Sequence, residues 1–243
     1  MLRAAGRRLF GRVLPKGMVL PILKGPLRGT KLILGSPAGP GGGGSLYFGL
    51  YEPDETTALQ HIVAPGQVFF DIGANIGYYS LLTAKLVGVQ GCVVAFEPLV
   101  RNVALLSRHT QLNHANNVTI VPCACAESSG IQEFSLGDNS ALGHLVVDGV
   151  NTAHTIIVPT IRVDEYVDRS GLEPNVMKID VEGSELSVLK GSSLTLERCR
   201  PWVLLSTHSN ELTHRCKEYL VEKAYRVRAL SGKTASFVAE PDC

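Results

Sequence analysis

The chain has 243 residues, which is enough for one α/β domain with a full hydrophobic core and does not require a second domain. Its formal net charge is only +1, so it lacks the overall positive field that attracts nucleic acid. No segment approaches the roughly 20 apolar residues that span a bilayer, and no continuous apolar stretch resembles a secretory signal. The six cysteines show no C-x-x-C or zinc spacing, so we expect a reduced, cytoplasmic protein with no membrane span.

Basic side chains dominate residues 1–50, which contain no acidic residue. We expect an N-terminal extension over this range, with short strands at 18–23 and 31–34 and a Gly-rich flap at 35–45. The folded domain would then occupy residues 51–243. A basic arm of this kind is able to contact anionic lipid, nucleic acid or an acidic partner, although a solvated extension is the simpler interpretation.

Hydrophobic periodicity alternates between helix-like and strand-like along the rest of the chain. The expected helices cover residues 53–63, 77–87, 99–113, 164–169, 183–198 and 211–224. The expected strands cover residues 68–72, 92–97, 118–126, 175–181, 202–208, 225–230 and 234–239. Such alternation predicts a doubly wound, Rossmann-like α/β sheet that is mostly parallel, with helices on both faces. The last two strands flank a Ser-Gly-Lys turn and predict a C-terminal hairpin, which adds one antiparallel strand.

Residues 127–163 interrupt this alternation with clusters of Ser, Gly and Asn and with two short β-like runs near 131–136 and 156–163. Loops on a rigid scaffold often carry specificity, so we expect substrate contacts in this insertion. Just before it, Cys123 and Cys125 are two apart on a predicted strand, and they should therefore point to the same face of the sheet.

A glycine-rich turn follows the first strand of the expected sheet. Asp71 ends that strand, and Gly73, Asn75 and Gly77 form the turn into the next helix. A strand, a glycine turn and a helix in this order hold nucleotide-like ligands, because glycine allows close approach and the helix start offers unpaired N–H groups. The sequence therefore predicts a nucleotide site at this turn.

Two acidic residues at strand ends indicate which nucleotide fits. Asp71 would repel a pyrophosphate but accept hydrogen bonds from an ammonium group, and the G-x-G-x-x-G pattern of dinucleotide-binding proteins is absent. Glu97 ends the next strand, about twenty residues after Gly77, where a carboxylate binds ribose hydroxyls in folds of this type. The pair favours S-adenosylmethionine over NAD.

The stretch 177–185 is another informative motif. Asp180 lies at the carboxyl end of a predicted strand, where open α/β sheets place their ligands. Glu182 lies in the following turn, and Glu185 lies in the first turn of the next helix, where it would compensate the helix dipole. Lys178 is predicted to pair with a nearby carboxylate.

Three motifs in this order resemble the FkbM family of S-adenosylmethionine-dependent methyltransferases. They are Asp-Ile-Gly-Ala-Asn-Ile-Gly-Tyr-Tyr-Ser at 71–80, Phe-Glu-Pro at 96–98 and Lys-Ile-Asp-Val-Glu-Gly-Ser-Glu-Leu-Ser-Val-Leu-Lys-Gly at 178–191; Gly-Leu-Tyr-Glu at 49–52 is also similar. The resemblance implies a class I methyltransferase fold. It further implies methyl transfer, usually to an oxygen of a sugar or secondary metabolite, and so a small-molecule acceptor rather than nucleic acid.

The resemblance also implies particular cofactor contacts. The residues that match are Tyr51, Glu52, Asp71, Gly73, Asn75, Gly77 and Glu97, and the general fold pattern places Ala126 and Glu127, just past the third strand, near the adenine. The chain departs from the family at the end of the fifth strand, where relatives often carry a glutamate and Ser206-Thr207-His208 stands here.

An acceptor hydroxyl needs a base or a metal ion to lose its proton, while methyl transfer itself depends mainly on alignment. Asp180 and His208 are the candidate catalytic residues, since both follow core strands on the ligand side, and histidine has the better-matched pKa. A second option makes Asp180 and Glu182 ligands of a hard cation such as Mg²⁺. We favour the metal-free interpretation.

Other functions fit parts of the sequence. An NAD-dependent oxidoreductase uses the same layers, but the Asp71 and Asn75 pattern argues against it. A nucleic-acid or protein methyltransferase would use the basic arm, although the sequence shows no RNA-binding module and no base-methylating Pro-Pro-aromatic motif. A scaffold protein that binds the methyl donor without turnover is the last alternative.

Overall fold

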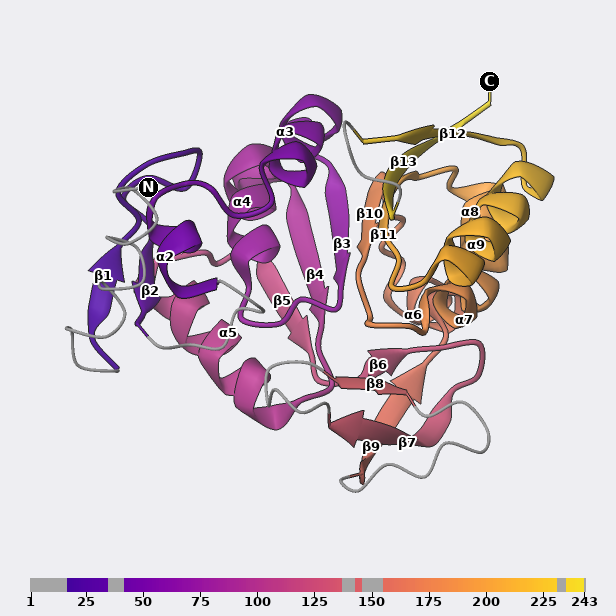
Figure 1. Cartoon of the computed structure of the whole chain (residues 1–243), viewed down its shortest axis with the longest axis horizontal. Helices are drawn as coiled ribbons and strands as arrows, with labels where there is room; N and C mark the ends of the chain where they lie inside the picture. The colour runs from indigo at the N-terminus through magenta and orange to yellow at the C-terminus, as the bar shows by residue number, and fades with distance from the viewer. Residues whose placement is uncertain (1–16, 35–41, 137–142, 146–154, 231–234, 243) are drawn as a thin grey trace.

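A central sheet of seven strands organises the protein (Figure 1). The computed structural model describes residues 17–34, 42–136, 143–145, 155–230 and 235–242. Along the sheet the strands follow the order β12-β13-β11-β10-β3-β4-β5. Their bounds are β3 Val68–Ile72, β4 Cys92–Phe96, β5 Val118–Val121, β10 Val176–Ile179, β11 Trp202–Ser206, β12 Tyr225–Ala229 and β13 Ser236–Pro241.

Strand direction in this sheet agrees with the sequence. Every pair is parallel except the two that involve β13, which runs antiparallel to both β11 and β12. The predicted C-terminal hairpin therefore exists, and it inserts one antiparallel strand into an otherwise parallel sheet. This confirms the predicted α/β class.

Helices cover both faces of the sheet (Figure 1). They are α3 Pro53–Ile62, α4 Tyr78–Val87, the short 3₁₀ turn Gly88–Gln90, α5 Val100–Leu112, α6 Val163–Ser170, α7 Glu185–Gly191, α8 Ser193–Arg198 and α9 Asn210–Glu222. Neighbouring strand residues face opposite layers, since side chains alternate along a strand. Phe69 belongs to the buried cluster with Leu81 of α4, whereas Phe70 belongs to the cluster with Val188 of α7 and Leu220 of α9. None of the described helices is long and apolar enough to cross a membrane.

The insertion forms a second sheet of four strands in the order β6-β9-β7-β8. Their bounds are β6 Ala124–Cys125, β7 Gly130–Leu136, β8 Gly143–Leu145 and β9 Thr155–Ile161. The single strand predicted at 118–126 is wrong, because β5 and β6 belong to different sheets. Pro122 lies directly after β5 and has no N–H to continue the ladder, so the chain turns out of the central sheet there.

The single helix predicted at 183–198 is also wrong, because the structure has two helices there: α7 ends at Gly191 and α8 begins at Ser193. Asp164 of α6 accepts hydrogen bonds from the backbone N–H groups of Leu194 at 3.2 Å and Thr195 at 2.8 Å. These N–H groups lie at the start of α8, where a helix has no internal acceptors for them. The break therefore supplies donors for a buried carboxylate.

The described cysteines are all free thiols. Cys123 and Cys125 belong to the same buried cluster as Phe70, while Ala124 between them belongs to the cluster under the second sheet. The two thiols therefore pack in one cluster, but Cys123 precedes β6, so the prediction that they share one strand face stays a prediction.

The described part of the N-terminal 50 residues packs onto the central layers. It contains a hairpin of β1 Val19–Pro21 and β2 Lys31–Ile33, followed by α2 Gly42–Tyr47. The basic residues 1–16 and the flap residues 35–41 lie outside the described residues. The rest of the predicted flap, 42–45, is helical rather than a loop, because α2 buries Leu46 and Tyr47 in the core and this burial outweighs the poor helix propensity of its glycines.

His109 of α5 joins this hairpin to the glycine turn. It is fully buried, its Nδ1–H donates to the carbonyl of Ile76 at 2.8 Å, and its Nε2 accepts the N–H of Ile33 at 3.0 Å. The bond from Ile33 needs the neutral ring, because Nε2 accepts a hydrogen bond only when it carries no proton. Burial lowers the pKa of His109 from its usual 6.5, and the bond to Ile76 opposes this only in part.

Replacing His109 by Gln should lower the free energy of unfolding by roughly 1–3 kcal/mol at pH 7.5, because two buried backbone groups lose their partner. In the unchanged protein, stability should also fall as pH drops below 6.5 toward the lower folded pKa, since the unfolded chain then binds the proton more readily. Thermal unfolding at pH 7.5 and 5.5 measures both effects. The exposed His61→Gln variant is the control, and an unchanged pH slope in H109Q would contradict this assignment.

Candidate functional site

A cavity of about 410 Å³ opens at the carboxyl ends of the central strands. It is bordered by Gly73 after β3, Glu97 after β4, Asp180 after β10 and His208 after β11. Open α/β sheets bind their ligands at this edge, because the loops that follow adjacent parallel strands converge there. The cavity is therefore the candidate functional site.

The glycine turn forms one wall of the cavity. Gly73 has φ +85°, and a Cβ atom on it would lie only 1.9 Å from the carbonyl oxygen of Asp180. The N–H groups of Gly73 and Ala74 both donate to the carbonyl of Phe96 at 3.0 Å. The turn thus requires glycine and ties the ends of β3, β4 and β10 together.

Glu97 is held rigidly beside that turn. It is 4% exposed, and its Oε2 accepts the N–H of Asn75 at 2.8 Å. Its Oε1 accepts the N–H of Leu99 at 2.9 Å and the side-chain amide of Asn102 at 3.1 Å. Burial raises the pKa of Glu97, while the two backbone donors oppose the shift. Because a carboxylate oxygen accepts about two hydrogen bonds, Oε2 can accept one more from a ligand.

Asp71 lies behind the wall rather than in the cavity lining. It is fully buried, its Oδ2 accepts the hydroxyl of Ser80 at 2.6 Å, and its Oδ1 has no partner among the described residues. Burial raises its pKa, and the nearby Lys178 opposes the shift. The predicted direct contact between Asp71 and a ligand ammonium stays a prediction, and in this geometry Asp71 influences the cavity through Lys178.

Two other predicted contacts also lie outside the lining. Gly77 begins α4, and a Cβ on it would lie 2.3 Å from the Leu106 side chain, so its small size serves helix packing. Ala126 is fully buried, and its carbonyl oxygen lies 2.0 Å from where a Cβ on Gly191 would be. Both positions fit a packing role.

Tyr51 and Glu52, which precede α3, do line the cavity. The Tyr79 hydroxyl donates to Glu52 Oε2 at 2.6 Å, and the Tyr51 ring packs on Tyr78 with centroids 4.8 Å apart. Burial raises the pKa of Glu52, and Lys178 opposes the shift. These aromatic contacts fix the Glu52 carboxylate at the cavity.

Lys178 provides a buried positive charge below these carboxylates. Its Nζ lies 3.1 Å from Asp180 Oδ2 and 4.6 Å from the Tyr79 ring centre. Burial lowers the pKa of Lys178, but Asp180, Asp71 and Glu52 outweigh that effect and hold the pKa above its usual value. The predicted pairing of Lys178 with a nearby carboxylate is confirmed.

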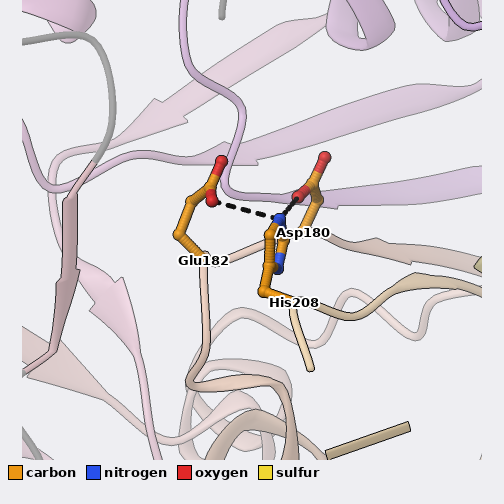
Figure 2. Close-up of side chains that lie close together, drawn as sticks. All are labelled: Asp180, Glu182 and His208. Carbon is orange, nitrogen blue, oxygen red and sulfur yellow. Dashed lines mark ion pairs between the residues drawn. The ribbon is translucent and has the colours of Figure 1, made fainter. Parts of the chain in front are cut away.

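Asp180, Glu182 and His208 meet at the cavity, although His208 comes from a different strand (Figure 2). His208 Nε2 lies 3.1 Å from Glu182 Oε2 and 3.6 Å from Asp180 Oδ1. The sequence placed Asp180 and His208 at neighbouring strand ends, and the structure brings their side chains together with Glu182. One atom from each of the three residues lies within 4.8 Å of the others.

Glu185 supports this cluster from below. It is fully buried, and its Oε1 lies 2.9 Å from His208 Nδ1 while it also accepts the N–H groups of Val181 and Gly183. Burial lowers the pKa of His208, but the hydrogen bond to Glu185 and the charges of Glu182 and Asp180 raise it to about 9. The sequence indicated only a dipole role for Glu185, because its contact with His208 joins residues 23 apart in the chain.

The opposite end of the cavity is apolar, and the sequence did not reveal it. Leu99, Ala124, Phe134 and Leu145 all line the cavity and belong to one buried cluster. Phe134 and Leu145 come from β7 and β8, so the insertion reaches the cavity at its apolar end. A flat aromatic group would fit between such side chains.

The charge of the lining is predominantly negative. The described lining residues that carry charge are Glu52, Glu55, Glu97, Asp180, Glu182, Lys178 and His208. Five carboxylates thus face one lysine and one histidine. A cavity of this kind favours a positively charged ligand and disfavours phosphate groups.

Comparison with solved structures gives the same architecture. The protein resembles the crystal structure of a methyltransferase FkbM from Methylobacillus flagellatus KT, with a TM-score of 0.53 at 19% identity. The likeness covers 81% of this chain and 53% of that one. At this identity it shows a shared fold, which confirms the class I methyltransferase architecture that the sequence predicted.

Two characterised relatives share more of the sequence. The hexuronic acid methyltransferase AglP of Haloferax volcanii is 30% identical over 159 residues, which cover 65% of this chain and 63% of the relative. The methyltransferase sdnD of Sordaria araneosa is also 30% identical, over 50% of this chain and 58% of the relative. The chain therefore spans less than two thirds of the length of either relative.

The family itself follows from the match to a family profile. The profile of the methyltransferase FkbM domain matches residues 71–227, which is more than half of the chain and includes the glycine turn, Glu97 and the Asp180–Glu182–His208 cluster. The chain belongs to the FkbM methyltransferase domain family.

Proposed function

We propose that this protein transfers the methyl group of S-adenosylmethionine to a hydroxyl oxygen of a small, sugar-like acceptor. The observation that carries the proposal is one cavity with an apolar end, a rigid carboxylate at Glu97 and a polar cluster at the other strand ends. Family membership supports the methyl donor, and the hexuronic acid named for AglP supports a sugar acceptor.

The donor fits the cavity in one direction. Its adenine occupies the apolar end between Leu99 and Phe134, and its ribose hydroxyls bind the remaining acceptor site of Glu97 Oε2. The methionine part then lies along the Gly73 turn, near Glu52. The acidic lining favours the sulfonium and ammonium charges of this donor, whereas the pyrophosphate of NAD and the phosphates of nucleic acid would be repelled.

The reaction is an in-line displacement. A bond forms between the acceptor oxygen and the methyl carbon, the carbon–sulfur bond breaks, and its electron pair stays on sulfur. The acceptor hydroxyl loses its proton at the cluster of Asp180, Glu182 and His208, which faces the cavity beyond Gly73. We propose Asp180 and His208 as the catalytic residues on this basis.

The acceptor side of the cavity carries hydroxyl groups. Ser184, Ser206 and Ser236 all line it, and serine hydroxyls can form hydrogen bonds with a polyhydroxylated molecule. Such a lining suits a small sugar better than a base, and it argues against the NAD-dependent and nucleic-acid alternatives. We retain the prediction of a cytoplasmic protein, which the free thiols favour.

Titration calorimetry should detect binding of S-adenosylmethionine and no binding of NAD at the same concentration. Glu97→Gln should weaken the affinity for S-adenosylmethionine about 10- to 100-fold, because a hydrogen bond to a charged group is lost. Glu218→Gln is the matched control, since this exposed carboxylate lies on α9 outside the cavity lining. Thermal unfolding checks that both variants fold. Binding of NAD in place of the methyl donor would overturn the proposal.

The rate of methyl transfer should depend on the acceptor end of the cavity. The affinity for S-adenosylmethionine should not. His208→Asn should lower kcat by at least about 100-fold, because it disrupts the cluster at which the acceptor hydroxyl loses its proton, with the affinity for S-adenosylmethionine changed less than about twofold. S-adenosylhomocysteine release with glucuronate and glucose glycosides as acceptors is the measurement. An equal loss of donor affinity and turnover would instead mean that His208 supports the donor site.

A further inference from the structure

We propose that Asp180, Glu182 and His208 bind a divalent cation, and that this cation holds two neighbouring oxygen atoms of the acceptor. The second part rests on the proposed function, whereas the cation site itself does not. Ligand atoms that occupy adjacent positions around an octahedral ion at about 2.1 Å lie about 3.0 Å apart. The separations of 3.1 Å and 3.6 Å from His208 Nε2 to the two carboxylates are close to this spacing (Figure 2).

The histidine is oriented as a metal ligand. Glu185 Oε1 lies 2.9 Å from Nδ1 of His208, so Nδ1–H donates to it and Nε2 points toward Asp180 and Glu182, where a cation would take the place of the Nε2 proton. A buried carboxylate behind a ligating histidine is the usual support of protein metal sites, since it fixes the tautomer and the ring. Glu185 is itself held by the backbone N–H groups of Val181 and Gly183.

The carboxylate of Asp180 is also oriented by a neighbouring side chain. Lys178 binds Oδ2 of Asp180 at 3.1 Å, which leaves Oδ1 on the side of His208. The donor set of two carboxylate oxygens and one imidazole nitrogen suits Mn²⁺ or Mg²⁺ better than soft metals. Three protein ligands leave coordination positions that open onto the cavity.

A second, independent observation points to a ligand here. Ser184 lines the same cavity, the residue is 95% buried, and its hydroxyl has no partner among the described residues. Buried polar groups in native proteins almost always have a partner, so this hydroxyl is left for a bound water or an acceptor oxygen. Ser184 lies two residues after Glu182 of the proposed site and directly before Glu185, which supports His208.

The negative charge of the cavity lining affects which acceptor can bind. Without a cation, the excess of carboxylates would repel an anionic acceptor such as a hexuronate. A divalent ion reverses the local charge and chelates either a carboxylate with its neighbouring hydroxyl or two adjacent hydroxyls. It also lowers the pKa of the bound hydroxyl, whose proton passes to solvent water, so His208 acts as a ligand rather than a base. This replaces the metal-free interpretation drawn from sequence.

The test measures Mn²⁺ binding to the full chain after chelator treatment, by electron paramagnetic resonance and calorimetry with the metal alone. We expect one saturable site per chain, competition by Mg²⁺, and at least a tenfold weaker affinity in Glu182→Gln, in line with the cost of altering metal-site residues. Glu218→Gln is the matched control, because Glu218 pairs with His214 on the exposed face of α9. The control should bind Mn²⁺ like the unchanged protein.

Parallel titration with S-adenosylmethionine separates this proposal from the proposed function. Donor binding without saturable Mn²⁺ binding, or Mn²⁺ binding that E182Q leaves unchanged, overturns the cation site and leaves the methyltransferase proposal standing. Mn²⁺ binding without donor binding overturns the proposed function instead. Because Glu182 lies in a partly exposed turn, E182Q should keep its thermal stability; if it does not, Asp180→Asn serves as the second variant.

Discussion

The close contact between Gly73 and the carbonyl of Asp180 is the constraint on which the site depends. Any side chain at Gly73 would collide with that oxygen, so only glycine lets the turn after β3 lie against the end of β10. The same turn directs the N–H of Asn75 to Glu97, which joins the end of β4 to the assembly. Three strand ends thus meet within a few ångströms, and the carboxylates of Glu97 and Asp180 at two of them line one cavity.

This concentration of carboxylates is compatible with folding because Lys178 lies among them. Burying one carboxylate without a partner costs several kcal/mol, whereas a buried pair with further hydrogen bonds recovers most of that cost. Lys178 contacts Asp180 directly and lies close enough to Asp71 and Glu52 to affect their pKa values. The lysine therefore stabilises the wall that carries the ligand-binding groups.

Local features of the fold could be predicted from the sequence, and contacts between distant segments could not. The alternation of side chains along a strand and the glycine turn can be predicted, because residues adjacent in the sequence determine them. Phe69 and Phe70 are an example, since these neighbours face opposite layers. The contact of Glu185 with His208 and the entry of Phe134 into the cavity depend on how whole elements pack, and no spacing in the sequence encodes that packing. Pro122 is by contrast a local signal, and it ends β5 within the single strand predicted over residues 118–126.

The acidic lining connects the two ends of the proposed reaction. The methyl donor carries a sulfonium charge that its thioether product lacks, so a negative cavity binds the donor more tightly than the product. The same field would keep a carboxylate-bearing acceptor away from the sulfur unless a positive charge stood at its end of the cavity. A cation held by Asp180, Glu182 and His208 supplies that charge at the acceptor end, while Glu52 and Glu97 provide the negative charge beside the donor. One lining can then select a cationic donor and an anionic acceptor.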